Sequence, residues 1–129
     1  MVFSLAVYSA PYSSQASYTA YQFATALLNQ GHHLHRVFFY QDGVHNASNL
    51  TIQPQDEFDL QRAWQELAKN HNLDIVVCIA AALKRGIIDE REAQRYNKAS
   101  HNLVNGFSIS GLGQLIEAAA ISDRLINFG

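Results

Sequence analysis

The sequence has only one cysteine, Cys78, among its 129 residues. A single thiol cannot close a disulfide within the chain, which excludes a secreted scaffold held together by disulfides. It also excludes a zinc module built from several cysteines. A chain of this length can bury a core without such cross-links, and we expect it to form one domain over residues 1–129.

Charged side chains are scarce as well. They make up 16% of the chain, against about 25% in a typical soluble domain. The formal net charge is −2, so the chain lacks the basic surface that direct binding to nucleic acid requires. No Lys, Arg, Asp or Glu precedes Arg36. We interpret this uncharged N-terminal segment as buried, or as contacting other subunits.

Long hydrophobic runs are absent too. The longest, Ile75–Leu83, is far shorter than the roughly 18–20 residues of a membrane span. The N-terminal run Val2–Val7 is too short for the apolar region of a signal peptide, and no basic residue precedes it. We therefore expect a cytoplasmic protein that does not contact a membrane.

The residues that are present follow an alternation of strands and helices. Apolar runs rich in β-branched and aromatic residues predict strands at Val2–Tyr8, Leu34–Tyr40, Asp74–Ile79, Gly106–Ile109 and Arg124–Phe128. Apolar residues at helical spacing predict helices over 16–30, 59–71, 80–86, 89–96 and 114–120. This alternation is typical of an α/β fold, and we expect a three-layer sandwich with a mostly parallel sheet of about five strands.

Helix caps and turns can be assigned in the same way. Ser13 or Ser14 is the expected N-cap of the first helix, and Asp56 or Asp59 that of the second. Gln41–Gly43 reads as a turn, and the polar stretch Val44–Pro54 reads as the longest irregular loop. In open sheets of this type, ligands lie beyond the carboxyl ends of the strands, which directs attention to the turns that follow them.

Cys78 falls at the carboxyl end of the third predicted strand, just before a predicted helix. Oriented N–H groups and the helix dipole at such a position favour thiolate over thiol. Asp42, His45, Lys84 and Arg85 are the candidates to tune this thiol or to dock a partner. Val-Val-Cys-Ile is equally typical of a buried core strand. The residues alone therefore leave open an inert core cysteine and a reactive one.

Other candidate sites have weaker signals. The hydroxyl-rich segment Ser9–Ser17 and the turn Ser108–Gly113 suggest an alternative function, a flavodoxin-like nucleotide-binding module. The turn lacks the third glycine of a dinucleotide fingerprint. His32, His33 and His35 cluster without a Cys, Asp or Glu nearby to complete a metal site. We therefore assign no cofactor and no metal.

Four segments together resemble DsrE-like sulfurtransferases, in the same order and spacing, and the resemblance extends from residue 2 to residue 128. The segments are Val37–Ala47, Phe58–Trp64, Val77–Gly86 and Gly106–Leu115. The resemblance implies that Cys78 is catalytic and accepts sulfane sulfur as a persulfide. The first turn, Tyr8–Tyr12, departs from the family because it lacks the glycine expected there.

The resemblance also implies a pathway and partners. The branch of the family that is most similar works in a bacterial relay that makes the 2-thiouridine of tRNA wobble positions. Such a subunit would assemble with TusB-like and TusC-like subunits in a heterohexamer, accept sulfur from a TusA-like donor and pass it to a TusE-like acceptor. A persulfide carrier in sulfur oxidation is the alternative that keeps the same chemistry.

Overall fold

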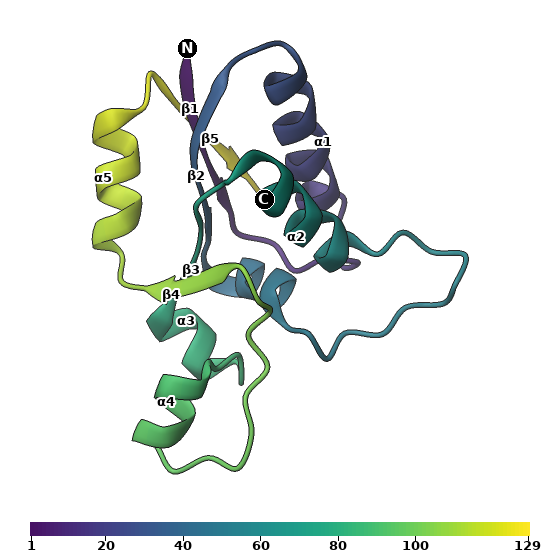
Figure 1. The fold of residues 1–129 in the computed structure, drawn as a ribbon, viewed down its shortest axis with the longest axis vertical. Helices are drawn as coiled ribbons and strands as arrows, with labels where there is room; N and C mark the ends of the chain where they lie inside the picture. The colour runs from purple at the N-terminus through teal and green to yellow at the C-terminus, as the bar shows by residue number, and fades with distance from the viewer.

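A single sheet of five parallel strands organises the chain in the computed structural model, which describes residues 1–129 (Figure 1). The strand order is β4-β3-β2-β1-β5, and each neighbouring pair is parallel. The strands are β1 (Val2–Val7), β2 (His33–Phe39), β3 (Ile75–Cys78), β4 (Phe107–Ser110) and β5 (Arg124–Phe128). This confirms the predicted α/β class, and the sheet is wholly rather than mostly parallel.

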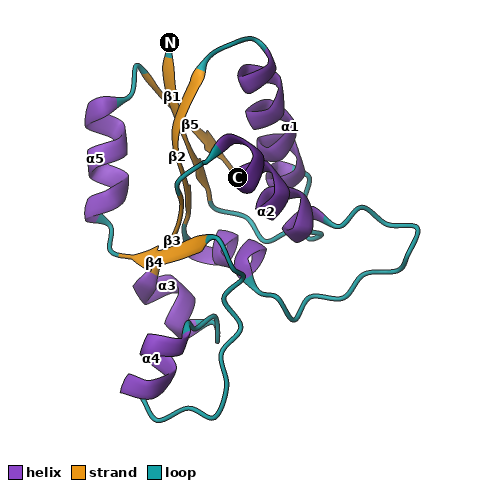
Figure 2. Ribbon diagram, in the orientation of Figure 1, coloured by secondary structure: helices purple, strands orange, loops and turns teal.

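Helices cover both faces of the sheet, and others lie beyond the carboxyl ends of its strands (Figure 2). The helices are α1 (Ala16–Asn29), the 3-10 helix η1 (Gln41–Ala47), α2 (Leu60–His71), α3 (Ile79–Lys84), α4 (Glu90–Arg95) and α5 (Gly113–Ile121). Helices α1 and α2 lie on one face and α5 on the other, which gives the three predicted layers (Figure 1). Helices α3 and α4 lie beyond the carboxyl edge of the sheet. None of these helices is both long and apolar enough to cross a bilayer.

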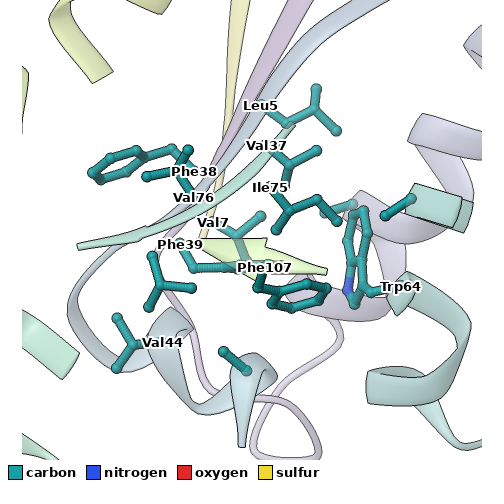
Figure 3. Close-up of a cluster of buried hydrophobic side chains, with 14 of the residues drawn as sticks. Leu5, Val7, Val37, Phe38, Phe39, Val44, Trp64, Ile75, Val76 and Phe107 are labelled. Atoms are coloured by element: carbon teal, nitrogen blue, oxygen red, sulfur yellow. The ribbon is translucent and has the colours of Figure 1, made fainter. Parts of the chain in front are cut away.

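Side chains of the central strands alternate between the two faces and pack into one continuous core. Phe38 and Val76 project from one face (Figure 3). Ile75 projects from the other, toward Trp64 of α2. The ring of Trp64 meets that of Phe39 edge-on at 5.5 Å. A 24-residue cluster of buried apolar side chains therefore spans the sheet and the helices packed on it.

Strand β1, the first part of the uncharged N-terminal segment, is buried as expected from its composition. Strand β1 lies between β2 and β5, and its residues Leu5, Ala6 and Val7 are fully buried. Because helices cover both faces of β1, no position along its second half faces water. This explains the absence of charge in β1, whereas residues 12–15 and the outer side of α1 are uncharged although they are exposed.

The expected irregular loop over 44–54 is wrong in its first part. Residues 41–47 form η1, so the expected turn Gln41–Gly43 is the first half of a helix. Ser48 then forms an antiparallel bridge with Leu103. The polar side chain of Asn46, which suggested a loop, is instead fully buried and donates hydrogen bonds inside the fold.

The helix caps match the prediction only in part. Asp59 caps α2 by accepting a hydrogen bond from the N–H of Arg62 at 3.1 Å, as predicted. For α1, however, the N-cap residue is Gln15, and its side chain makes no capping hydrogen bond. Ser14 stands one position earlier and accepts a hydrogen bond from the N–H of Ala16 at 3.3 Å. It satisfies one of the free N–H groups without being the cap.

Candidate active site

Cys78 is both the last residue of β3 and the N-cap residue of α3. Its φ of −62° and ψ of 122° are extended, so the chain turns from strand to helix directly after it. Strand β4 pairs Cys78 with Ser110, and paired residues of parallel strands project from the same face. Only 1% of the Cys78 surface is exposed. The cysteine thus lies at the carboxyl edge, as the sequence predicts, but inside the core.

The 3-10 helix η1 fits closely against the end of β1 because residue 43 is glycine. The Gly43 N–H donates to the carbonyl of Tyr8 at 3.1 Å. A Cβ at this position would overlap the carbonyl oxygen of Val7 and lie 2.8 Å from its carbonyl carbon. Asn46 Nδ2 donates to the carbonyl of Gly43 at 2.9 Å and to Ser17 Oγ at 3.1 Å. These contacts fix η1 to β1 and to the start of α1.

Asp42 and Arg85 form an ion pair between η1 and the residue that follows α3. Arg85 Nε donates to Asp42 Oδ1 at 2.8 Å, and Arg85 Nη1 donates to the carbonyl of Ala81 at 3.1 Å. The hydrogen bond from Arg85, and then its positive charge, hold the pKa of Asp42 below its usual value of 3.8. The charge of His45 acts in the same direction, and desolvation opposes it.

Three of the four residues predicted to accompany Cys78 come together at this edge. Asp42 and His45 belong to η1, and Arg85, the residue after α3, reaches Asp42. Lys84 does not join them: it is exposed and pairs with no carboxylate. Helix η1 packs against both β3 and α3, the two elements that meet at Cys78. Helix η1 is therefore part of the surroundings of the Cys78 thiol.

A buried polar cluster around Asn102 belongs to the same region, and sequence reasoning did not find it. Asn102 Oδ1 accepts from the N–H of Ile88 at 2.9 Å. Its Nδ2 donates to the carbonyl of Gly86 and to Ser48 Oγ, both at 3.1 Å. Asn102 thereby ties the end of η1 to the segment after α3. Its polar neighbours in the sequence resemble a surface loop, and no local signal marks it as buried.

The two segments of the nucleotide-binding alternative lie apart. Ser9–Ser17 follows β1 and Ser108–Gly113 includes the end of β4, and strands β2 and β3 stand between them. A cavity of about 590 Å³ borders the first segment and the start of α2. Tyr12, Tyr18 and Phe58 are among its lining residues, and no residue of the second segment lines it. The structure does not join the two segments into one site.

The three neighbouring histidines also point to separate places. His32 Nδ1 lies 3.3 Å from the amino nitrogen of Met1, and His35 Nε2 lies 3.5 Å from Glu117 Oε1. His33 is exposed at the start of β2. No group of three or more His, Cys, Asp or Glu side chains has an arrangement that could hold a metal ion.

Comparison with known proteins identifies a family and a fold. The model of the DsrE/DsrF-like family matches residues 1–128. Among solved structures, the crystal structure of the YchN protein from E. coli is similar, with a TM-score of 0.76 over 99% of this chain and 100% of that one. The two sequences are 21% identical, so this likeness concerns the fold.

Relatives with closer sequences cover the full chain. A protein of Allochromatium vinosum, provisionally named sulfurtransferase DsrE, is 54% identical over 129 residues, which is 100% of this chain and 99% of the relative. The sulfurtransferase TusD of Klebsiella pneumoniae is 52% identical over 128 residues, with 99% and 100% covered. A sulfurtransferase TusD homolog of Vibrio vulnificus is 50% identical over 126 residues, with 98% and 96% covered.

Proposed function

The chain belongs to the DsrE/DsrF-like family, and on that premise we propose that it is a sulfurtransferase that carries sulfur as a persulfide on Cys78. The observation that carries this proposal is the position of the only cysteine, at the carboxyl edge of a parallel sheet and at the junction with a helix. Relatives of about half-identical sequence over the full chain are named sulfurtransferases, which supports the same chemistry here.

The proposed transfer consists of two exchange steps at sulfur. The Cys78 thiolate attacks the outer sulfur of a donor persulfide, a bond forms between Sγ and that sulfur, and the donor leaves as a thiolate. An acceptor thiolate then attacks the same outer sulfur and releases Cys78 as a thiolate. One sulfur–sulfur bond forms and one breaks in each step, so no external oxidant or reductant is needed.

The absence of a second cysteine suits this sequence of steps. A resolving cysteine in the same chain would attack the inner sulfur of the persulfide and form an intramolecular disulfide. With Cys78 alone, the sulfur stays on the chain until a thiol of another protein arrives. The second thiol of the relay is therefore on the acceptor.

For the pathway, we propose 2-thiolation of the tRNA wobble uridine, with a TusA-like donor and a TusE-like acceptor. The relatives named TusD support this assignment. Sulfur oxidation is the second candidate, because the Allochromatium vinosum relative is named DsrE. Both pathways use the same exchange at Cys78. The net charge of −2 favours a protein that passes sulfur to other proteins over one that binds tRNA directly.

For the assembly, we propose a heterohexamer with TusB-like and TusC-like subunits. Helix α5 supports contact with other subunits, because it buries only Ala118 and leaves large apolar side chains in solvent. Leu112, just before the helix, is 42% exposed, Ile116 is 71% exposed and Ile121 is 53% exposed. Apolar side chains gathered on one helix in this way are typical of a protein–protein contact.

The test is transfer of labelled sulfur from a donor persulfide to this chain and on to an acceptor. We expect Cys78→Ser to lose both steps while it keeps the wild-type circular dichroism spectrum. Ser108→Ala, an exposed position on neighbouring β4, is the matched control and should transfer at the wild-type rate. Labelled sulfur on the Cys78→Ser chain would refute the proposal. The level of 2-thiouridine in cells that carry each variant separates the two pathways.

A further inference from the structure

The burial of Cys78 is at odds with the work of a relay thiol. Its side chain is 1% exposed, yet it has to meet a sulfur atom carried by another protein. Such burial is typical of a cysteine that packs as a small apolar side chain and does not react. If Cys78 is the acceptor in the proposed function, then some part of its surroundings has to move first.

Helix α3, which begins directly after Cys78, is short and lies at the periphery of the fold. Helix α3 has six residues, and no side chain caps its start at Cys78. On one side it meets η1, which also packs against β3. Figure 1 shows α3 and α4 beyond the edge of the sheet, joined back to β4 by a long segment. Such a peripheral unit is a natural place for local opening.

Polar contacts at two ends join residues 41–49 to residues 79–104. At one end, backbone hydrogen bonds link the two segments: Val104 N–H donates to the carbonyl of Ala47 at 2.9 Å, and Asn49 N–H donates to that of Asn102 at 2.8 Å. At the other end stands the Arg85–Asp42 pair at 2.8 Å. It is the only ion pair between residues 79–104 and the rest of the chain.

We propose that α3 forms a lid over Cys78 that closes against the fixed η1, hinged at the backbone contact of Ala47 with Val104 and latched by the Arg85–Asp42 ion pair. The latch has to open before sulfur reaches the thiol. The Asp42 side chain is 62% exposed and that of Arg85 is 29% exposed, so an approaching protein can reach the latch from solvent. This inference concerns access to the site of the proposed function and rests on that function for its purpose.

The test measures how fast iodoacetamide alkylates Cys78 in the folded protein. Exposed ion pairs stabilise the closed form modestly, so we expect Asp42→Asn and Arg85→Gln each to accelerate alkylation about two- to fivefold. The double variant should react no faster than the single ones, because both substitutions remove the same contact. Arg62→Gln, which breaks the exposed Arg62–Glu66 pair of α2, is the matched control and should react at the wild-type rate.

Charge effects on the thiol are distinguished by their sign. Asp42→Asn removes a negative charge and Arg85→Gln removes a positive one, so a purely electrostatic effect would move the two rates in opposite directions. Loss of the Arg85–Asp42 latch would accelerate alkylation in both variants. Opening of a lid exposes little surface, so the rate should depend only weakly on low concentrations of urea. Unchanged rates in both variants, rates that move in opposite directions, or an equal acceleration in Arg62→Gln would overturn the lid.

A parallel experiment with a small persulfide donor separates this inference from the proposed function. If the latch variants are alkylated faster but no variant takes up sulfur, the lid stands and the sulfurtransferase proposal falls. If all variants take up sulfur and are alkylated at the wild-type rate, the lid falls and the sulfurtransferase proposal stands.

Discussion

Gly43→Ala is the substitution that most directly tests how η1 is held in place. The new Cβ would overlap the carbonyl oxygen of Val7 and lie 2.8 Å from its carbonyl carbon. Both atoms belong to the backbone of a central strand, and they cannot move aside. Helix η1 has to shift instead, and the 3.1 Å hydrogen bond from Gly43 to the carbonyl of Tyr8 lengthens with it.

The expected loss of stability in Gly43→Ala is the sum of two costs, overpacking and a lost hydrogen bond. Overpacking in a fixed surrounding costs about 1–3 kcal/mol, and a lost hydrogen bond costs about 1 kcal/mol. We therefore expect Gly43→Ala to lower the free energy of unfolding by about 2–4 kcal/mol. Because η1 carries Asp42 and packs against α3, its shift should also accelerate alkylation of Cys78, and by more than in the ion-pair variants.

Urea unfolding followed by tryptophan fluorescence measures the change. The chain has one tryptophan, Trp64, which is fully buried between α2 and the sheet (Figure 3). Gly111→Ala is the matched control, because a Cβ there would have no neighbour within 4 Å. It should leave stability within about 0.5 kcal/mol of wild type. A Gly43→Ala protein as stable as this control would refute the close fit of η1 against β1.

Two further predictions concern Asp42 and helix α5. The folded-state pKa of Asp42 is lowered, so its pairing with Arg85 stabilises the fold above the usual value near 3.8 and is lost as pH falls through the folded-state value. Asp42→Asn should therefore lower the Tm at neutral pH, and the difference from wild type should vanish once the pH is below the lowered folded-state pKa of Asp42; a difference of undiminished size in acid that protonates Asp42 would contradict the pairing. Ile116→Ser should leave the free energy of unfolding of the isolated chain within about 0.5 kcal/mol of wild type and weaken assembly with the proposed partner subunits, measured by size-exclusion chromatography. Ala26→Ser on the exposed side of α1 is its control, and unchanged assembly of Ile116→Ser would speak against α5 as the contact.

Much of the fold is predictable because its inner strands are buried on both faces. The runs Val2–Tyr8 and Asp74–Ile79 are typical of strands in a covered parallel sheet, and the structure places them as β1 and β3. The same periodicity predicts that Cys78 stands where a strand turns into a helix. From this position the carboxyl-edge rule alone is enough to select Cys78 as a candidate.

The surroundings of Cys78 are less predictable because they depend on contacts between distant residues. Asp42 and Arg85 are 43 positions apart, and nothing in their local sequence tells that they pair. The polar side chains of Asn46 and Asn102 suggest surface loops, whereas their amides form hydrogen bonds with backbone groups inside the fold. The helical form of η1 likewise depends on the fit of Gly43 against β1, which only the assembled sheet creates.

The central proposal, that Cys78 carries sulfur, is tested most directly by mass spectrometry of the chain after incubation with a persulfide donor. We predict a gain of one sulfur atom, located by peptide mapping on Cys78 and removed by a reductant. The Cys78→Ser chain should show no gain under the same conditions. A wild-type chain that stays unmodified in its assembled complex, or sulfur bound equally by the Cys78→Ser chain, would contradict the proposal.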